Sequence, residues 1–371
     1  MDTNDLDVTD HIAIPARARR RSVVSAFDLS LDELVAWMAD HGQPAFRARQ
    51  LFHALYVTLN SSYDTMSVLP KALRERLTDE LPLNALTPVR EIVTDDGETL
   101  KVLYRLPDGH TVETVLMFYP ERATVCVSCQ VGCAVGCSFC ATGMGGLQRN
   151  LTAGEIVAQV VDMARRARAQ GRPLTNLVMM GMGEPFHNYA ATMQMIGIIN
   201  DREGMAFGAR RITISTSGIV PFIDKLAEEP YQVNLAVSIH AGNDALRSSL
   251  VPINARWPID ELLAACRRYI VCTGRRVSFE YALMAGVNGS PHDAVELAER
   301  LKGMLCHVNV IPYNPTPGAN YRRPTPAEIE AFVDQLQRRG ISATVRYSRG
   351  VDIGAACGQL RAQEAETSAA G

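Results

Sequence analysis

Five of the nine cysteines of the chain lie in one stretch, Cys126-Val-Ser-Cys129-Gln-Val-Gly-Cys133-Ala-Val-Gly-Cys137-Ser-Phe-Cys140, and the last three are spaced C-x3-C-x2-C. Three thiolates this close in sequence can bind one inorganic centre and leave one position of it open. A cubic iron–sulfur cluster held by three cysteines keeps one iron open for another ligand. A structural zinc site instead needs a fourth protein ligand. The stretch therefore predicts a metal centre and leaves both kinds open.

The composition is that of an ordinary globular protein. The 371 residues are 47% hydrophobic and 21% charged, with a formal net charge of −3. This charge gives no global basic footprint, so any RNA-binding surface has to be local. We find no apolar run of about 18 residues and no secretory leader, so we expect a cytoplasmic protein that does not span a membrane. In that compartment, clustered cysteines indicate metal or redox chemistry rather than a disulfide framework.

The N-terminal part predicts a tail followed by a helical module. Residues 1–28 are polar and partly basic, which favours a flexible tail and leaves an electrostatic RNA contact as the alternative. Three short helices are predicted in residues 29–85, after the N-cap Ser30 and after Pro44 and Pro70. The module carries a locally basic set of side chains: Arg47, Arg49, Lys71, Arg74 and Arg76. These charges fit a solvated surface and an RNA contact equally well.

Residues 86–120 predict a small antiparallel sheet. Three strand-like segments alternate with the turn signals Asp95-Asp-Gly97 and Pro107-Asp-Gly109. Glu113 lies in the third of these segments. A carboxylate on a strand usually faces solvent, so the pattern alone gives this residue no role.

Residues 121–349 alternate between strands and helices. Seven apolar segments predict strands, and they begin near residues 124, 175, 211, 233, 277, 307 and 343. Helical patterns lie between them, which predicts an α/β fold with a parallel sheet, either open or curled into a partial barrel. In such folds the functional site forms at the carboxyl ends of the strands.

Small and polar residues follow these predicted strands. The cysteine stretch follows the first strand. The others are followed by Gly181-Met-Gly-Glu184-Pro185, Ser215-Thr-Ser217, Ser238-Ile239-His240 and Pro312-Tyr-Asn314-Pro315. Glycines allow the backbone to approach a ligand closely, and the polar side chains supply donors and acceptors. Together they predict a polar ligand pocket facing the three-cysteine centre.

The cysteines outside the stretch fall into two groups. Cys266, Cys272 and Cys306 lie in apolar contexts and are predicted to be buried small hydrophobic residues. Cys357 lies in a glycine-bounded loop within the C-terminal segment 350–371, where a thiol could reach the site.

The cysteine spacing, followed by a strand that ends in Gly181-Met-Gly-Glu-Pro185, resembles the radical S-adenosylmethionine superfamily. Three further motifs resemble its bacterial dual-specificity RNA adenine methyltransferases: Ser238-Ile-His-Ala241, Ile311-Pro-Tyr-Asn-Pro315 and Ala356-Cys-Gly-Gln-Leu360. The likeness covers roughly residues 30–360. It implies a partial (β/α)6-type barrel that carries the helical module and the antiparallel extension.

The resemblance also implies the cofactors. Cys133, Cys137 and Cys140 would hold a [4Fe–4S] cluster whose open iron binds S-adenosylmethionine. The implied contacts to S-adenosylmethionine are Gly183, Glu184, Ser215, Ser238, Ile239, His240 and Asn314. Cys129 stands where the family pattern has a serine, and we expect it to be a passive variant.

The implied reaction methylates carbon 2 of an adenine in 23S rRNA and of the adenine 3′ to the anticodon in tRNA. Carbon 2 lies between two ring nitrogens, so it is too electron-poor to attack the sulfonium methyl group directly. In the family, a first S-adenosylmethionine methylates Cys357, and a radical made from a second activates that methyl group. Cys126 then resolves the covalent RNA adduct and leaves a disulfide, and Glu113 matches the general base.

Two alternatives remain at this point. Sister enzymes that methylate carbon 8 of the same ribosomal adenine share most of these motifs. A zinc-stabilised RNA-binding protein without catalysis would also use clustered cysteines. The resemblance further implies an external electron donor similar to flavodoxin or ferredoxin, RNA as the partner, and a monomer that does not bind a membrane.

Overall fold

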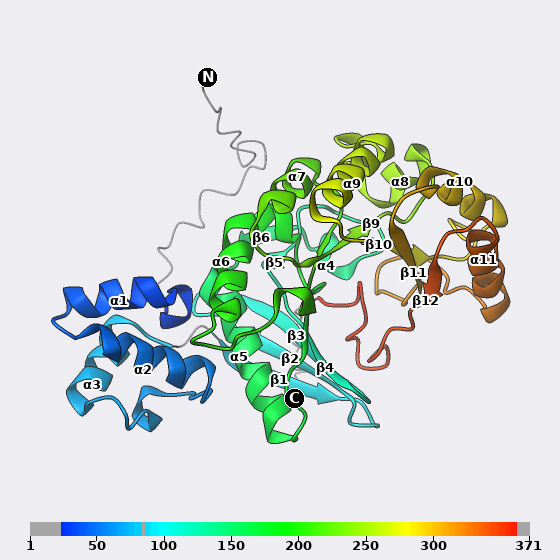
Figure 1. Cartoon of the computed structure of the whole chain (residues 1–371). Helices are drawn as coiled ribbons and strands as arrows, with labels where there is room; N and C mark the ends of the chain where they lie inside the picture. Colours follow the sequence, from blue (N-terminus) through cyan, green and yellow to red (C-terminus); the bar gives the residue numbers. More distant parts are fainter. Residues whose placement is uncertain (1–23, 84–85, 362–371) are drawn as a thin grey trace, which may run out of the picture.

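The computed structural model describes residues 24–83 and 86–361 (Figure 1). Residues 1–23 of the predicted tail lie outside this range. Residues 24–28 are described and include the 3-10 helix η3 (Ala26–Asp28), in which Ala26 and Phe27 are buried. The helical module therefore includes residues before the predicted boundary at 29.

Three helices form the N-terminal module: α1 (Leu31–Asp40), α2 (Ala45–Tyr56) and α3 (Lys71–Glu80), with the short η4 (Tyr63–Thr65) between the last two. Ser30 caps α1 in a reciprocal capping box with Glu33, as the sequence predicts. The module packs beside α5 and α6 of the main body (Figure 1). Asp28 fixes this contact, because its Oδ1 accepts a hydrogen bond from the backbone N–H of Gly154 at the start of α5 (2.6 Å).

Ten strands of the described chain form one sheet, in the order β1-β2-β3-β4-β7-β8-β9-β10-β11-β12. The first three, β1 (Thr87–Val93), β2 (Thr99–Arg105) and β3 (Thr111–Tyr119), pair antiparallel, as predicted. Strand β4 (Arg122–Cys126) pairs antiparallel with β3 and parallel with β7. The antiparallel extension is therefore continuous with the barrel sheet, and Cys126 ends the strand that joins them.

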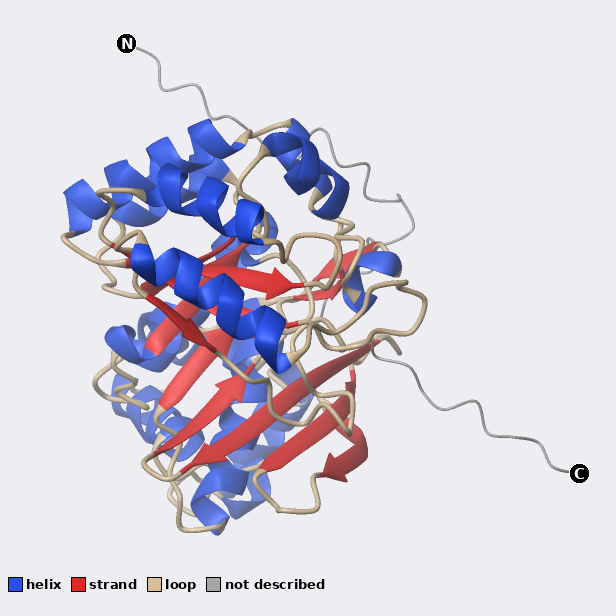
Figure 2. Ribbon diagram, turned by 90° about the vertical axis from the view of Figure 1, so that its right-hand side faces the viewer, coloured by secondary structure: helices blue, strands red, loops and turns tan. Residues whose placement is uncertain are grey.

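The barrel strands after β4 all pair in parallel. They are β7 (Asn176–Met179), β8 (Ile212–Thr216), β9 (Asn234–Ser238), β10 (Val277–Leu283), β11 (Cys306–Pro312) and β12 (Ala343–Val345). The crossover helices are α5 (Ala153–Ala169), α6 (Tyr189–Asn200), α7 (Val220–Glu228), α9 (Ile259–Thr273), α10 (Pro291–Leu301) and α11 (Pro326–Arg338). Six strand–helix units followed by β12 confirm the predicted partial barrel, and Figures 1 and 2 show its strands as one curved layer with helices outside.

Smaller elements surround the cysteine stretch. Strands β5 (Gln130–Gly132) and β6 (Leu147–Asn150) form a separate antiparallel pair, and the short helix α4 (Ala141–Met144) follows Cys140 directly. A further short helix, α8 (Asp244–Leu250), precedes α9. After β12 the chain returns across the space between the barrel and the antiparallel strands (red trace in Figure 1).

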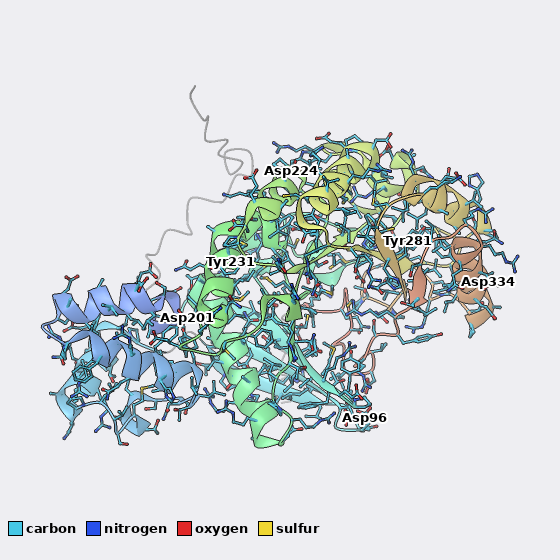
Figure 3. All side chains as sticks on the ribbon, viewed as in Figure 1. Asp96, Asp201, Asp224, Tyr231, Tyr281 and Asp334 are labelled. Atoms are coloured by element: carbon cyan, nitrogen blue, oxygen red, sulfur yellow. The ribbon has the colours of Figure 1, made fainter. Side chains whose placement is uncertain are left out.

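Side chains alternate along each barrel strand. Hydrophobic side chains face the helices outside the sheet, and polar side chains face the barrel interior. Tyr281 of β10 is labelled in Figure 3. Its ring packs against Phe332 of α11, with 4.8 Å between the ring centroids. Successive side chains on a strand face opposite sides, so the neighbouring Glu280 faces the barrel interior. No helix in the described part of the chain is long and apolar enough to cross a membrane.

One prediction about the isolated cysteines is wrong. Cys266 and Cys306 are buried as expected, but Cys272 is exposed. Cys266 and Cys272 lie on the same helix six residues apart, which places them about 240° apart around its axis. An apolar neighbourhood in sequence therefore does not bury both side chains.

Candidate active site

A cavity opens at the carboxyl ends of the barrel strands. Its lining includes most of the residues that the sequence predicts for the site: Cys133, Cys137, Cys140, Gly183, Glu184, Ser215, Ser238, His240, Asn314 and Cys357. Ile239 is fully buried in the hydrophobic core, and it is not part of this lining. Cys129 is buried and also lies outside the lining.

The three cysteines of the C-x3-C-x2-C run lie close together at the cavity. Burial raises the pKa of Cys133 to about 12, and it also raises the pKa of Cys137. The charges of the neighbouring thiols raise both values further, which shows that the three thiols are electrostatic neighbours. Without a metal Cys133 and Cys137 hold their protons, and a bound cation is what would convert them to thiolates.

The donor set of these cysteines fits a [4Fe–4S] cluster, because three thiols of one C-x3-C-x2-C run line the cavity and the run leaves a fourth position open. Within residues 24–83 and 86–361, no three His, Cys, Asp or Glu side chains are grouped closely enough to hold one metal ion. A structural zinc ion needs four protein ligands at about 2–2.3 Å from one atom. A cubic [4Fe–4S] cluster binds each cysteine through a different iron, so its sulfur ligands stand further apart.

Glu184 is buried at the turn after β7. Its Oε2 accepts hydrogen bonds from the backbone N–H (2.7 Å) and hydroxyl (2.8 Å) of Ser217, and its Oε1 accepts one from the N–H of Phe186 (3.0 Å). The residue before Glu184 has to be glycine. Gly183 has a φ of +106°, and a Cβ at this position would lie 2.6 Å from Cβ of Gln130. The carboxylate thus joins the ends of β7 and β8.

Arg247 of α8 joins the ends of β8 and β9. The sequence did not indicate this role. Its fully buried guanidinium donates hydrogen bonds to the carbonyls of Ser217 (2.6 Å), Ser238 (3.0 Å) and Ile239 (3.1 Å). Burial lowers the pKa of Arg247 to about 10, so the side chain is charged at neutral pH. The only sequence signal is a helical arginine close behind the motif Ser238-Ile239-His240.

His240 is held as a neutral ring. Its Nδ1 accepts a hydrogen bond from the backbone N–H of Ala282 (2.9 Å), which requires the tautomer with the proton on Nε2. Burial, with the charge of Arg247 adding to it, lowers the pKa of His240 to about 3. The backbone of His240 has a φ of +56°, and its ring meets Phe139 of the cysteine stretch edge-on at 4.8 Å.

Cys126 and Cys357, which do not belong to the C-x3-C-x2-C run, lie near each other. Burial raises the pKa of Cys126 to about 12, and the charge of Cys357 raises it further. The carbonyl of Cys357 accepts a hydrogen bond from the Asn314 amide (3.3 Å), which ties the loop to the end of β11. All nine cysteines are free in the structure, so the disulfide implied for the reaction is not formed in it.

Glu113 is buried, contrary to the usual position of a strand carboxylate. Lys101 of the neighbouring strand β2 forms an ion pair with its Oε1 (2.9 Å), and the N–H of Arg361 donates to its Oε2 (2.8 Å). Lys101 also donates to the carbonyl of Gly354 (3.1 Å), in the loop before Cys357. The C-terminal segment is thus fixed beside Glu113, which a local sequence pattern cannot show.

The predicted basic side chains of the helical module have partners within the described structure. Arg49 pairs with Glu203, and Arg76 pairs with Glu80. Arg47 and Arg74 donate to backbone carbonyls of the module, and Lys71 lies near Glu75. These pairs are exposed, so they leave the surface able to exchange partners.

Comparisons with known proteins identify the superfamily and the fold. The radical SAM superfamily model matches residues 127–300, and a model described as a ribosomal RNA large subunit methyltransferase N-terminal domain matches residues 24–82. The crystal structure of a radical SAM methyltransferase from Sphaerobacter thermophilus is similar with a TM-score of 0.91 and 66% identity, covering 92% of this chain and 100% of that one. The predicted superfamily and fold are confirmed.

Curated relatives are similar over most of the chain. The probable dual-specificity RNA methyltransferase RlmN of Chloroflexus aurantiacus is 50% identical over 345 residues, covering 90% of this chain and 92% of the relative. The protein of the same description from Bacillus cytotoxicus is 46% identical, covering 92% of this chain and 94% of the relative. The chain therefore belongs to the RlmN family of radical S-adenosylmethionine RNA methyltransferases.

Proposed function

We propose that this RNA methyltransferase methylates carbon 2 of an adenine in the peptidyl transferase centre of 23S rRNA and of the adenine 3′ to the anticodon in tRNAs. The observation that supports it most is the pair of free thiols, Cys126 and Cys357, beside the three-cysteine cavity. A carbon too electron-poor to attack a sulfonium needs a cysteine that carries the methyl group and a second cysteine that releases the product. The chain places both thiols in one region.

Cys133, Cys137 and Cys140 would hold the [4Fe–4S] cluster, and the cluster with S-adenosylmethionine supplies the methyl group and the radical chemistry when bound. Polar groups at the strand ends would orient the S-adenosylmethionine, with Ser215, Ser238 and Asn314 lining the cavity. The neutral His240 offers an Nε2–H donor there. The sequence-predicted contact through Ile239 is limited to its backbone, because its side chain is in the core.

Cys357 receives the methyl group as a thiolate, so its proton must leave first. Glu113 would take the proton from the substituted ring carbon; its position against the C-terminal segment places it near the loop of Cys357. The Cys126 thiolate then attacks the Cys357 sulfur. A sulfur–sulfur bond forms, the carbon–sulfur bond breaks, and its electron pair goes to the methylene carbon, which takes a proton to become the methyl group.

The partners follow from this chemistry. We propose that an external donor similar to flavodoxin or ferredoxin reduces the cluster, and that the protein acts as a cytoplasmic monomer. The target adenine has to leave its stack to reach a buried thiol. The N-terminal module (residues 29–85) is our candidate for the RNA contact, supported by its exposed basic side chains.

The test is methylation of 23S rRNA and tRNA by anaerobically purified protein with S-adenosylmethionine and a reductant. Chromatography and mass spectrometry of the digested RNA should show 2-methyladenosine. Cys357→Ala should abolish product while the cluster absorption remains, and Cys126→Ala should accumulate protein crosslinked to RNA. The exposed Cys272→Ala serves as the matched control and should keep full activity.

Three outcomes would contradict the proposal. Turnover by Cys357→Ala would exclude the methyl-carrier role. 8-Methyladenosine as the product would identify the carbon-8 activity instead. Stoichiometric zinc, with neither iron nor acid-labile sulfide, would indicate the non-catalytic RNA-binding alternative.

A further inference from the structure

We propose that Arg346, held in place by Glu280, is a positioning residue shared by the two catalytic thiols. In this role it stabilises the thiolate of Cys357 when that residue accepts the methyl group, and the thiolate of Cys126 when it attacks the adduct. The inference rests on the proposed function for the two cysteines, and it adds a residue for which no role was predicted from the sequence.

Arg346 is delivered to the site by the last strand of the barrel. It follows β12 directly, and its backbone N–H donates to the carbonyl of Val310 on β11 (2.8 Å), which continues the pairing of the two strands. Its guanidinium lines the same cavity as Cys357, and 32% of the side chain is exposed. Arg346 thus lies at the carboxyl end of a barrel strand, as the site residues predicted from the sequence do.

A buried carboxylate fixes the guanidinium. Glu280 lies in the middle of β10, and its Oε2 pairs with Nη1 of Arg346 at 3.3 Å. Its Oε1 accepts a hydrogen bond from the side-chain amide of Asn309 (2.8 Å), the residue directly opposite on β11. Because the carboxylate is held from a neighbouring strand, it can orient Arg346 without moving itself.

The remaining donors of Arg346 are available to a further anion. Among the described residues, the side-chain hydrogen bonds of Arg346 use Nη1 alone, to Glu280 and to the sulfur of Met180 (3.4 Å). Nε and Nη2 therefore have no protein acceptor in that part of the chain. A guanidinium with free donors beside two thiols can bind whichever of them is ionised.

The electrostatics couple the same groups. The charge of Cys357 is the largest influence on the pKa of Arg346 and raises it, with Glu280, Tyr119 and Cys126 adding to the effect. Burial raises the pKa of Cys126, whereas a hydrogen bond from the Met180 amide and the charge of Arg346 act in the opposite direction. Arg346 is thus a cation coupled electrostatically to both thiols.

Each of the two steps begins from a thiolate. In the first, the Cys357 thiol releases a proton, a bond from its sulfur to the methyl carbon forms, and S-adenosylhomocysteine leaves with the electron pair of the broken bond. In the second, Cys126 attacks the sulfur of Cys357, as described above. A nearby cation typically favours the charged form of a group by about 1–3 pH units, so one arginine can assist both steps.

The alternative is that the Arg346–Glu280 pair only joins the strands of the barrel. Removing it would then lower the melting temperature without changing the reactivity of either thiol. A readout that follows thiolate formation, and needs neither RNA nor turnover, separates the two roles.

The experiment measures iodoacetamide alkylation of cluster-loaded full-length protein between pH 7 and 9, with peptide mass spectrometry of Cys357 and with the exposed Cys272 as internal reference. Only protein whose Cys357 is unmethylated by mass is used. Arg346→Met should slow the reaction of Cys357 about tenfold at pH 7.5, because the thiolate is the reactive form. Arg346→Lys should restore much of it, and the surface control Arg268→Met should change nothing.

Glu280→Gln should change the alkylation rate of Cys357 in the opposite direction to Arg346→Met. The amide of glutamine keeps an acceptor oxygen for Nη1, so Arg346 should keep its position while its charge is no longer compensated, and Cys357 should react faster than in the unaltered protein. Alkylation profiles that are unchanged in Arg346→Met and Glu280→Gln, or a slower reaction in Glu280→Gln, would overturn the proposal. Since alkylation needs no RNA, this result is independent of whether Cys357→Ala abolishes methylation.

Discussion

The two walls of the cavity are held together in different ways. We call one the cofactor wall: Glu184, Ser217, Ser238 and His240 line the cavity, and Arg247 supports them from outside the lining. We call the other the thiol wall: Arg346 and Cys357 line the cavity, and we include with them Lys101, Glu113 and Cys126, which are not lining residues. In the cofactor wall, hydrogen bonds join residues from consecutive strand–helix units, such as Glu184 with Ser217 and Arg247 with Ser238. In the thiol wall they join parts of the chain more than 200 residues apart.

This difference shows how the two walls depend on the fold. Glu184, Ser217, Ser238 and His240 each follow or end a strand, and Arg247 comes from α8 after β9, so the wall is complete once neighbouring strand–helix units pack. The thiol wall forms only when the segment after β12 returns to β2, β3 and α4. Lys101 bonds the carbonyl of Gly354, and Thr142 bonds that of Leu360. A variant should therefore affect one wall while leaving the other in place.

The largest effect we expect concerns the alkylation of Cys126, in the thiol wall, by iodoacetamide. With a pKa of about 12, only about one thiol in 10⁴ is ionised at pH 8, and thiolate is the reactive form. Iodoacetamide should therefore alkylate Cys126 at least about 10³-fold more slowly than the exposed Cys272. Because the thiolate fraction grows with pH, the rate should rise about tenfold per unit up to about pH 12. Peptide mass spectrometry of a time course measures both rates.

The pH dependence separates ionisation from access. If Cys126 is simply enclosed, its rate stays low at every pH below unfolding, and the tenfold rise per unit is absent. Equal rates for Cys126 and Cys272 at pH 8 would show that the thiol wall is open to water, contrary to the burial of Cys126.

The next effect concerns the cofactor wall. Arg247→Met leaves the carbonyls of Ser217, Ser238 and Ile239 without their buried donor. Such a loss typically costs about 3–5 kcal/mol, and we expect this decrease in the free energy of unfolding from anaerobic urea titrations. Binding of S-adenosylmethionine should weaken as well, because the strand ends lose their common anchor.

Arg268→Met is the control for this substitution. Arg268 forms an exposed bidentate pair with Asp224 on the barrel surface, and such pairs contribute about 0–1 kcal/mol. A loss in Arg247→Met no larger than in Arg268→Met would show that the cofactor wall does not depend on its central arginine.

The same contrast explains how much of the molecule could be predicted from the sequence. The strands, the crossover helices and the strand-end motifs are local, so periodicity and turn residues indicated the barrel and most of the residues lining its cavity. The N-cap at Ser30 follows from a pattern of four residues. Motifs of this kind specify the cofactor wall because each lies at the end of its own strand.

The missed features of the thiol wall all depend on long-range packing. Lys101 is one of many strand lysines, and only the return of the C-terminal segment brings Gly354 to it. Arg346 could have been noticed as the residue after the seventh strand, but its partner Glu280 is defined by the register of β10 with β11. The role of Glu113 was implied only by the family resemblance. The local sequence does not show that Glu113 is buried, because its burial depends on Lys101 and Arg361.

A moderate effect is expected from Lys101→Met in the thiol wall. The side chain is only 12% exposed, and its removal takes an ion-pair partner from Glu113 and a donor from the carbonyl of Gly354. We expect a loss of about 2–3 kcal/mol in the free energy of unfolding. Methylation should slow, while the cluster absorption and S-adenosylmethionine binding remain, because the cofactor wall is untouched.

The exposed Lys302, at the end of α10, supplies the matched control Lys302→Met. This substitution should change neither stability nor methylation appreciably. Loss of S-adenosylmethionine binding in Lys101→Met would contradict the separation of the two walls, since it would show that the thiol wall also holds the cofactor contacts in place.

The smallest effect compares one hydrogen bond next to each wall. Thr142 of α4 is buried, and its hydroxyl donates to the carbonyl of Leu360 (2.7 Å). Thr192 of α6, also buried, donates to the carbonyl of Pro185 (3.2 Å), beside Glu184. Replacing either by valine keeps the shape and removes one buried bond, so each should lower the free energy of unfolding by about 1 kcal/mol.

The two substitutions should differ in where the structure loosens. In Thr142→Val, amide hydrogen exchange should accelerate at Arg361, whose N–H donates to Glu113, because the segment has lost a neighbouring anchor. In Thr192→Val that amide should exchange as in the unaltered protein, since the antiparallel strands still hold it. Equal acceleration at Arg361 in both variants would mean that the walls open together, and the C-terminal segment would then depend on the barrel as a whole rather than on its own hydrogen bonds.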